Sequence, residues 1–124
     1  MGSGITYVFC PYTHKNPRVR QWRVDTAAMY CAALRAEGVH PYCAIVECHP
    51  VEAFMDGDKG AFEHWEEYNQ LQMRNAIDAV ILPLPGWKTS NGIEGECKFW
   101  YEDLQRGSII RIDSMWLERI ALNV

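Results

Sequence analysis

Short apolar runs alternate with segments of helical periodicity along this chain of 124 residues. Runs rich in β-branched and aromatic residues predict buried strands, at residues 5–10, 40–47, 78–84 and 108–112. Apolar positions spaced three or four residues apart predict helices, at residues 17–37, 61–76, 91–107 and 114–122. Strand and helix therefore alternate throughout, with a long connection over residues 48–60.

The helix over residues 17–37 has the clearest pattern. Ala27, Tyr30 and Leu34 recur at intervals of three and four residues and form one apolar stripe. Gly38 follows directly, and glycine is the usual residue just after a helix because it tolerates a left-handed backbone. We therefore expect this helix to pack one face on a sheet and to end before Gly38.

The alternation of strands and helices predicts an α/β fold with a parallel sheet. Right-handed crossovers would place helices on both faces of that sheet. We expect a flavodoxin-like, doubly wound three-layer sandwich with a four- or five-stranded parallel sheet. No internal repeat or low-complexity segment divides residues 1–124, so the whole chain is predicted to form a single domain.

Charge and hydropathy limit the classes of partner. The formal net charge is −4, whereas proteins that bind nucleic acid polymers usually carry a basic surface. No segment reaches the ~20 apolar residues of a membrane helix, and the first residues do not resemble a secretory signal. We therefore expect a cytoplasmic protein that binds neither a nucleic acid polymer nor a membrane.

One dense basic cluster interrupts this acidic balance. It consists of Arg18, Arg20 and Arg23. The interpretation from charge pattern alone is the solvated start of a helix. A local cluster of this kind can still bind a small anion on an acidic protein, so a phosphorylated ligand stays possible.

The chain has five cysteines, at positions 10, 31, 43, 48 and 97. An odd number without a secretory signal favours reduced thiols over a disulfide framework. His40, Cys43, Cys48 and His49 lie close together in the sequence, which could suggest zinc, but no C-x-x-C pair is present. Because this segment is predicted to be a strand, its alternate side chains would face opposite sides. We therefore expect no metal site.

Side chains capable of chemistry concentrate in the loops that follow the predicted strands. These loops span residues 11–15, 47–50 and 85–92 and are rich in aromatic, hydroxyl and histidine side chains. In open parallel sheets, ligands bind outside the carboxyl ends of the strands. The sequence therefore predicts a site at this edge of the sheet.

Common signatures of nucleotide-binding and hydrolytic enzymes are missing. The chain contains no G-x-G-x-x-G, no G-x-x-x-x-G-K-[ST] and no G-x-S-x-G. Their absence disfavours a dinucleotide-dependent dehydrogenase, a P-loop kinase and a hydrolase with a serine triad.

Glu96 is the strongest candidate for a catalytic group. It lies within about two turns of the start of the third predicted helix, whose amino end carries partial positive charge. It follows Ile93 by three positions, so it borders the apolar stripe and is not forced toward solvent. A carboxylate at the mouth of a sheet can serve as a nucleophile or stabilise an oxocarbenium-like centre. The alternative is an ordinary surface glutamate, as we expect for Glu94.

Four motifs then resemble those of nucleoside 2-deoxyribosyltransferase-like proteins. Residues 7–12 (YVFCPY) resemble the family's opening Y-L-A-[SG]-P-[YF], and residues 13–20 (THKNPRVR) resemble the continuation of an uncharacterised bacterial and phage branch. Residues 78–87 (DAVILPLPGW) are similar to its D-A-[LV]-[LV]-V-L-x-L-P-G-W strand. Residues 90–96 (SNGIEGE) resemble its S-x-G-x-x-x-E helix entry. The motifs occur in family order over most of residues 5–112.

This resemblance implies roles for individual residues. Glu96 matches the catalytic glutamate, which attacks the anomeric carbon of a 2-deoxyribosyl group. Tyr7 matches a first-strand tyrosine that helps to orient the glutamate, although a buried tyrosine could equally be part of the core. Ser90 stands where the transferases often carry an aspartate that contacts the base. Asn69 or Gln70 falls where a second aspartate is expected, and neither is a carboxylate.

The remaining expected contacts to the substrate come from the same loops and helix entries. They are Pro11, Tyr12, His14, His49, Asn69, Gln70, Trp87, Ser90, Asn91 and Gly92. Trp87 could stack on a base or close the edge of the core. His14 could lie in a solvated loop, and His49 could be a structural histidine.

The resemblance implies cleavage or transfer at the N-glycosidic bond of a (deoxy)nucleoside or nucleoside 5′-monophosphate. This chemistry needs no metal or organic cofactor, and family members commonly form homo-oligomers. An amide cannot protonate a leaving base as the family's acid does, so another donor, such as His49 or His64, would be needed. Two alternatives stay open: a non-catalytic nucleotide-binding module and an NAD-type glycohydrolase.

Overall fold

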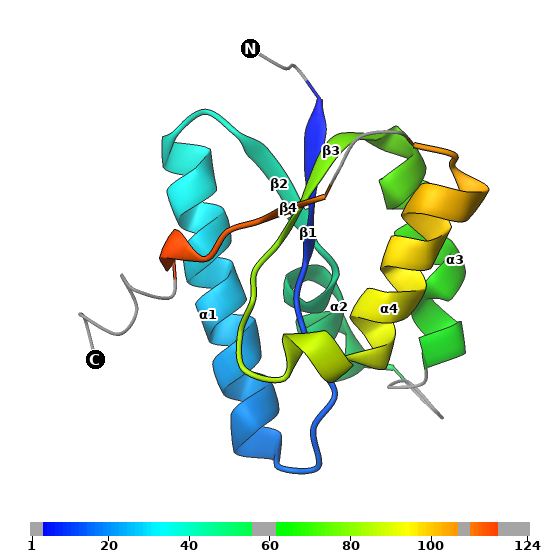
Figure 1. Cartoon of the computed structure of the whole chain (residues 1–124). Helices are drawn as coiled ribbons and strands as arrows, with labels where there is room; N and C mark the ends of the chain where they lie inside the picture. The colour runs from blue at the N-terminus through cyan, green and yellow to red at the C-terminus, as the bar shows by residue number, and fades with distance from the viewer. Residues whose placement is uncertain (1–3, 56–61, 107–109, 117–124) are drawn as a thin grey trace.

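The fold is a parallel sheet enclosed by helices, in a computed structural model that describes residues 4–55, 62–106 and 110–116. The strands are β1 (Ile5–Phe9), β2 (His40–Cys43), β3 (Ala76–Ile81) and β4 (Arg111–Ile112). They pair in the order β2-β1-β3-β4, and every pairing is parallel. The predicted α/β, flavodoxin-like class is confirmed, with a sheet of four strands in the described part of the chain; Figure 1 shows the arrangement.

The helices connect these strands in sequence order. They are α1 (Pro17–Ala36), α2 (Ala44–Glu52), α3 (Phe62–Asn75) and α4 (Asn91–Lys98). A short turn, η1 (Trp87–Thr89), precedes α4, and a π-helical turn, η2 (Phe99–Asp103), extends it. Figure 1 shows α1 on one side of the sheet and α3 and α4 on the other. No described helix is both long and apolar enough to cross a membrane.

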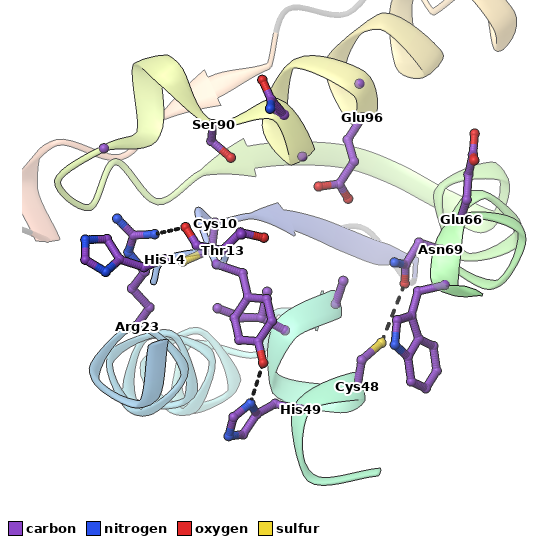
Figure 2. A pocket seen from close by; sticks show the side chains of 18 of the residues that line it. Cys10, Thr13, His14, Arg23, Cys48, His49, Glu66, Asn69, Ser90 and Glu96 are labelled. Carbon is purple, nitrogen blue, oxygen red and sulfur yellow. Dashed lines mark hydrogen bonds between the residues drawn. The ribbon is translucent and has the colours of Figure 1, made fainter. Parts of the chain in front are cut away.

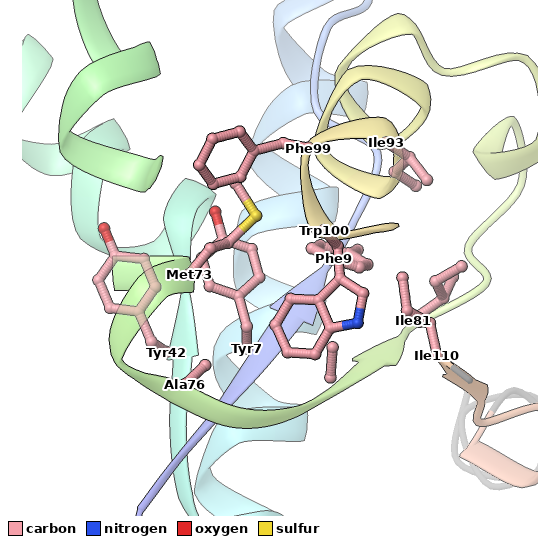
Figure 3. Close-up of a cluster of buried hydrophobic side chains, with 11 residues drawn as sticks. Tyr7, Phe9, Tyr42, Met73, Ala76, Ile81, Ile93, Phe99, Trp100 and Ile110 are labelled. Atoms are coloured by element: carbon pink, nitrogen blue, oxygen red, sulfur yellow. The ribbon is translucent and has the colours of Figure 1, made fainter. Parts of the chain in front are cut away.

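Alternation along β1 divides the core into two layers. Tyr7 and Phe9 face the side covered by α3 and α4, where Trp100 is fully buried (Figure 3). Val8 and Cys10 face the opposite side and pack against α1. Because successive side chains of a strand point to opposite faces, this one strand supplies both halves of the core.

Local capping sets the ends of α1 and α4. The Asn16 side chain accepts a hydrogen bond from the Arg18 backbone N–H at 2.9 Å, directly before Pro17 at the first helical position. Gly38 follows α1 with a φ of +85°, as its sequence position predicts. Ser90 caps α4 by accepting from the Ile93 N–H at 3.3 Å.

The predicted strand over residues 40–47 is wrong in its second half. β2 ends at Cys43, the partner of Val8, and the chain turns at once into α2. Residues 44–46 are apolar, and periodicity alone does not distinguish such a short run from a buried strand. In the structure Ile45 and Val46 pack against the α1 side of the core and Ala44 against the opposite side, and the predicted connection over residues 48–60 begins inside α2.

Other boundaries also differ from the predictions. β3 begins at Ala76 and ends at Ile81, so residues 82–84 are buried loop, although the Leu82 N–H still bonds to the Phe9 carbonyl at 2.9 Å. The helix predicted over residues 91–107 is α-helical only to Lys98, and its π-helical extension ends at Asp103. β4 covers residues 111–112 of the fourth strand, which is predicted over residues 108–112. Residues 108–109, and residues 117–122 of the closing helix predicted over residues 114–122, lie outside the described residues.

The packing of Phe9 generates a stability prediction. Its ring is fully buried and meets the Trp100 ring edge-on, with centroids 6.4 Å apart. Phe9→Ala should lower the free energy of unfolding by about 3–5 kcal/mol, measured by urea denaturation, because a cavity replaces the ring. Ile112→Ala, at an exposed position, should change it by less than about 0.5 kcal/mol. Equal effects of the two substitutions would contradict this description of the core.

Candidate active site

A large pocket opens at the carboxyl ends of the strands. Its volume is about 1310 Å³, and it is bordered by the loops after β1 and β3 and by α1, α2, α3 and α4. The chain leaves β1 toward β2 on one side and later reaches β3 on the other. The crevice between β1 and β3 is therefore the switch point at which open α/β sheets bind ligands.

Glu96 and Tyr7 form the central pair. The Tyr7 hydroxyl donates a hydrogen bond to Glu96 Oε2 at 2.5 Å. Tyr7 is fully buried, and its ring lies against Phe9 and Tyr42, with centroid distances of 5.0 and 5.5 Å. The tyrosine thus holds the carboxylate from the core side. In Figure 2 the Glu96 carboxylate points from α4 into the pocket.

Burial changes the acidity of both groups. It raises the pKa of Glu96 to about 7, and the hydrogen bond from Tyr7 partly opposes this increase because it stabilises the carboxylate. Burial also raises the pKa of Tyr7 well above its usual value, and the neighbouring Glu96 charge adds to the effect. Tyr7 is therefore a permanent hydrogen-bond donor, whereas Glu96 changes its charge near neutral pH.

The entry of α4 forms the wall next to Glu96. Ser90, Asn91 and Gly92 all line the pocket. A Cβ atom placed on Gly92 would have only Ser90 Oγ near it, at 3.8 Å, so the backbone at Gly92 faces open space. A helix amino end carries partial positive charge, which favours an electron-rich group of a ligand.

A chain of hydrogen bonds joins Tyr12, His49 and Gln21 on the wall of the pocket that lies opposite Glu96. Tyr12 Oη lies 2.7 Å from His49 Nδ1, and His49 Nε2 lies 3.0 Å from Gln21 Oε1. Gln21 Nε2 donates to Asp25 Oδ1 at 2.9 Å, so the Gln21 oxygen must accept from His49. The proton of neutral His49 therefore sits on Nε2, and Tyr12 donates to Nδ1.

Arg23 is a pocket residue that the sequence analysis interpreted as solvated. It is 7 % exposed and donates to the carbonyls of Thr13, at 3.0 Å, and Pro85, at 2.9 Å. It therefore joins the loops after β1 and β3 across the switch point. Its Nε is buried without a partner. Arg23 precedes Ala27 by four residues and thus continues the apolar stripe of α1, which is the signal that distinguishes it from Arg18.

The α3 wall carries Asn69 and Gln70, together with Glu66, which the sequence analysis did not single out. Asn69 Oδ1 accepts from the Tyr42 hydroxyl at 3.2 Å, and Gln70 Nε2 donates to Glu66 at 3.2 Å. Glu52 of α2 also lines the pocket and accepts from the Trp65 ring N–H at 2.7 Å. Glu66 and Glu52 carry no motif, so only the fold brings them here.

Most of the residues that are predicted to contact the substrate line the pocket. The lining includes Tyr12, His14, His49, Asn69, Gln70, Ser90, Asn91, Gly92 and Glu96. Pro11 is fully buried, and Trp87 packs against the hydrophobic cluster of Figure 3, so these two support the wall from behind. The side chain of His64 lies outside the described part of the structure.

All five cysteines are free thiols. The strand alternation used against zinc does not apply to Cys48 and His49, because both lie in α2. Across the described residues, no three His, Cys, Asp or Glu side chains lie close enough to hold a metal ion.

The Tyr7–Glu96 hydrogen bond generates a titration prediction. In wild type, the Glu96 carboxyl should titrate near pH 7, measured by ¹³C NMR of the labelled side chain. Tyr7→Phe removes the donor that stabilises the carboxylate, so the midpoint should move to higher pH. Tyr101→Phe, at an exposed tyrosine outside the pocket lining, is the matched control and should leave it unchanged. A midpoint near 4.5, or one unmoved by Tyr7→Phe, would contradict the geometry.

Comparison with known proteins identifies the family of this chain. No curated protein matches it. One family model matches residues 4–111, and its description is a domain of unknown function, DUF1937. The match covers most of the chain, from β1 to the beginning of β4. The chain therefore belongs to the DUF1937 family.

Proposed function

We propose that this protein cleaves or transfers the N-glycosidic bond of a (deoxy)nucleoside or nucleoside 5′-monophosphate, with Glu96 as the nucleophile. The observation that carries the proposal is the half-buried carboxylate of Glu96, held by the Tyr7 hydroxyl at 2.5 Å beside a pocket of about 1310 Å³. The motif resemblance to nucleoside 2-deoxyribosyltransferase-like proteins supports the same assignment.

The reaction would proceed in two displacements. The ionised Glu96 attacks the anomeric carbon, and the electron pair of the breaking C–N bond leaves with the base. Water or a second base then displaces Glu96 and completes hydrolysis or transfer. The Tyr7 hydroxyl keeps one carboxylate oxygen fixed, so that the other oxygen is the one free to react.

The pocket chemistry favours an aromatic base on a polar sugar. The pocket is large enough for a ligand of this size, and the Tyr12–His49 pair offers hydrogen-bonding groups on its far wall. Arg23 is a buried cation, and a buried charge is costly unless it is compensated. A phosphate on the sugar would compensate it, which supports the 5′-monophosphate as a substrate.

A non-catalytic nucleotide-binding module is the second candidate. Ser90, and either Asn69 or Gln70, stand where carboxylates occur in the transferases, and an amide does not protonate a leaving base. If catalysis has been lost, the same pocket would still bind a nucleotide.

Base release separates the two candidates. Wild type and Glu96→Ala would be incubated at pH 8 with deoxynucleosides, ribonucleosides, their 5′-monophosphates and NAD, and free base would be measured by chromatography. We expect wild type to release base from at least one substrate, and Glu96→Ala to be slower by about a thousandfold or more, because the nucleophile is lost. Glu94→Ala, on the exposed side of α4, should match wild type.

The other outcomes are equally informative. Nicotinamide release from NAD alone would identify the glycohydrolase. Equal release by wild type and Glu96→Ala would exclude Glu96 as the nucleophile. No release by folded wild type, together with a nucleotide-dependent thermal shift, would favour the binding module.

A further inference from the structure

The oxygen of the Asn69 amide is turned toward hydroxyl and thiol groups from two other segments. Its oxygen accepts a hydrogen bond from the Tyr42 hydroxyl of β2 at 3.2 Å. The same oxygen faces the Cys48 thiol of α2, with the sulfur 4.0 Å away. A carbonyl oxygen has two lone pairs, so these two donors occupy its accepting capacity.

The nitrogen of this amide is left for the pocket. Asn69 Nδ2 has two N–H groups, and neither has an acceptor among the described residues. Figure 2 shows the oxygen turned toward Cys48 and the nitrogen turned toward the space that Glu96 also enters. Asn69 thus presents only donors to a ligand, although a free asparagine presents both a donor and an acceptor.

We infer that Asn69 determines base specificity and selects bases that carry an oxo group over those that carry an amino group at the same position. This inference rests on the proposed N-glycosidic function of the same pocket. An asparagine with a free oxygen reads adenine by pairing with both N6 and N7. Here the oxygen is already used, so an exocyclic amino group would meet N–H donors and leave them unpaired.

The hydrogen bond from Asn69 to an oxo group of the base compensates in part for the missing carboxyl group, which protonates the leaving base in the transferases. When the bond between C1′ and the base nitrogen breaks, its electron pair enters the base, and negative charge develops on the conjugated oxo group. An N–H of Asn69 donates to that oxygen without transferring its proton, and water later supplies the proton that neutralises the free base. An amino base has no such oxygen at that position, so it is a poorer leaving group in this pocket.

Matched substrate pairs test the inference. Hypoxanthine and adenine deoxynucleotides differ mainly in one oxo or amino group, and so do uracil and cytosine deoxynucleotides. Wild type should show kcat/KM higher by about 10- to 100-fold for the oxo member of at least one pair, the effect of one unpaired buried donor. At pH 8, Asn69→Asp should reverse this ratio, because an ionised carboxylate only accepts hydrogen bonds and therefore favours the amino group over the oxo group. Asn69→Ala should bring it close to one.

Two further variants control for structural damage. The ratio of two substrates on one protein is independent of the fraction that is folded, so misfolding alone does not change it. Tyr42→Phe removes the main donor to Asn69 Oδ1 and lets the amide group rotate by 180°. The ratio of kcat/KM for the oxo and amino substrates should therefore move closer to one. Asn75→Asp makes the same chemical change on the same helix at an exposed position, where the side chain bonds to the Leu71 carbonyl, and should leave the ratio unchanged.

The outcomes separate this inference from the proposed function. If base release depends on Glu96 but the oxo preference is absent, or persists in Asn69→Asp and Asn69→Ala, the inference is overturned and the proposed function stands. If wild type releases no base, the proposed function fails, and calorimetric binding of the same nucleotide pairs decides the inference. An oxo preference in binding that Asn69→Asp reverses would uphold it, whereas equal affinities or no binding would overturn it.

Discussion

The hydrogen bond from Tyr7 to Glu96 is the constraint on which the architecture of this site depends. It joins β1 to α4, and the two residues are 89 positions apart in the sequence. It forms only if β1 places Tyr7 on the α4 side and if the Ser90 cap starts α4 so that Ile93 and Glu96 face the sheet. A slip of β1 by one residue would turn Tyr7 to the opposite layer.

This constraint also explains why a carboxylate with a raised pKa is tolerated at the sheet edge. Burying Glu96 disfavours its charged form, and Tyr7 restores part of the lost solvation. The polar groups of the surrounding wall are engaged in hydrogen bonds of their own: Arg23 spans two loops, and Tyr12, His49 and Gln21 form a chain. The pocket is therefore preorganised, and its free groups are left for a ligand.

Much of the fold was predictable because its signals are local. The apolar runs of β1 and β3, the stripe of α1 and the Gly38 stop all appear in short segments. The first turn of α2 was mistaken for strand because an apolar run of that length fits both structures. The orientation of Asn69 and the bond from Arg23 to the Pro85 carbonyl were not predictable, because each depends on a segment distant in sequence. The burial of Arg23 has a local signal, its place on the apolar stripe of α1, which the charge pattern of the arginine cluster obscured.

The most direct test of Glu96 as nucleophile is to trap the covalent glycosyl-enzyme. A 2′-fluorinated deoxynucleoside with a good leaving base destabilises the oxocarbenium-like transition states and slows turnover of the intermediate. Intact-mass spectrometry should show one added fluorosugar, and peptide mapping should locate it on Glu96. An unmodified protein that still releases the base, or a label on another residue, would contradict the account.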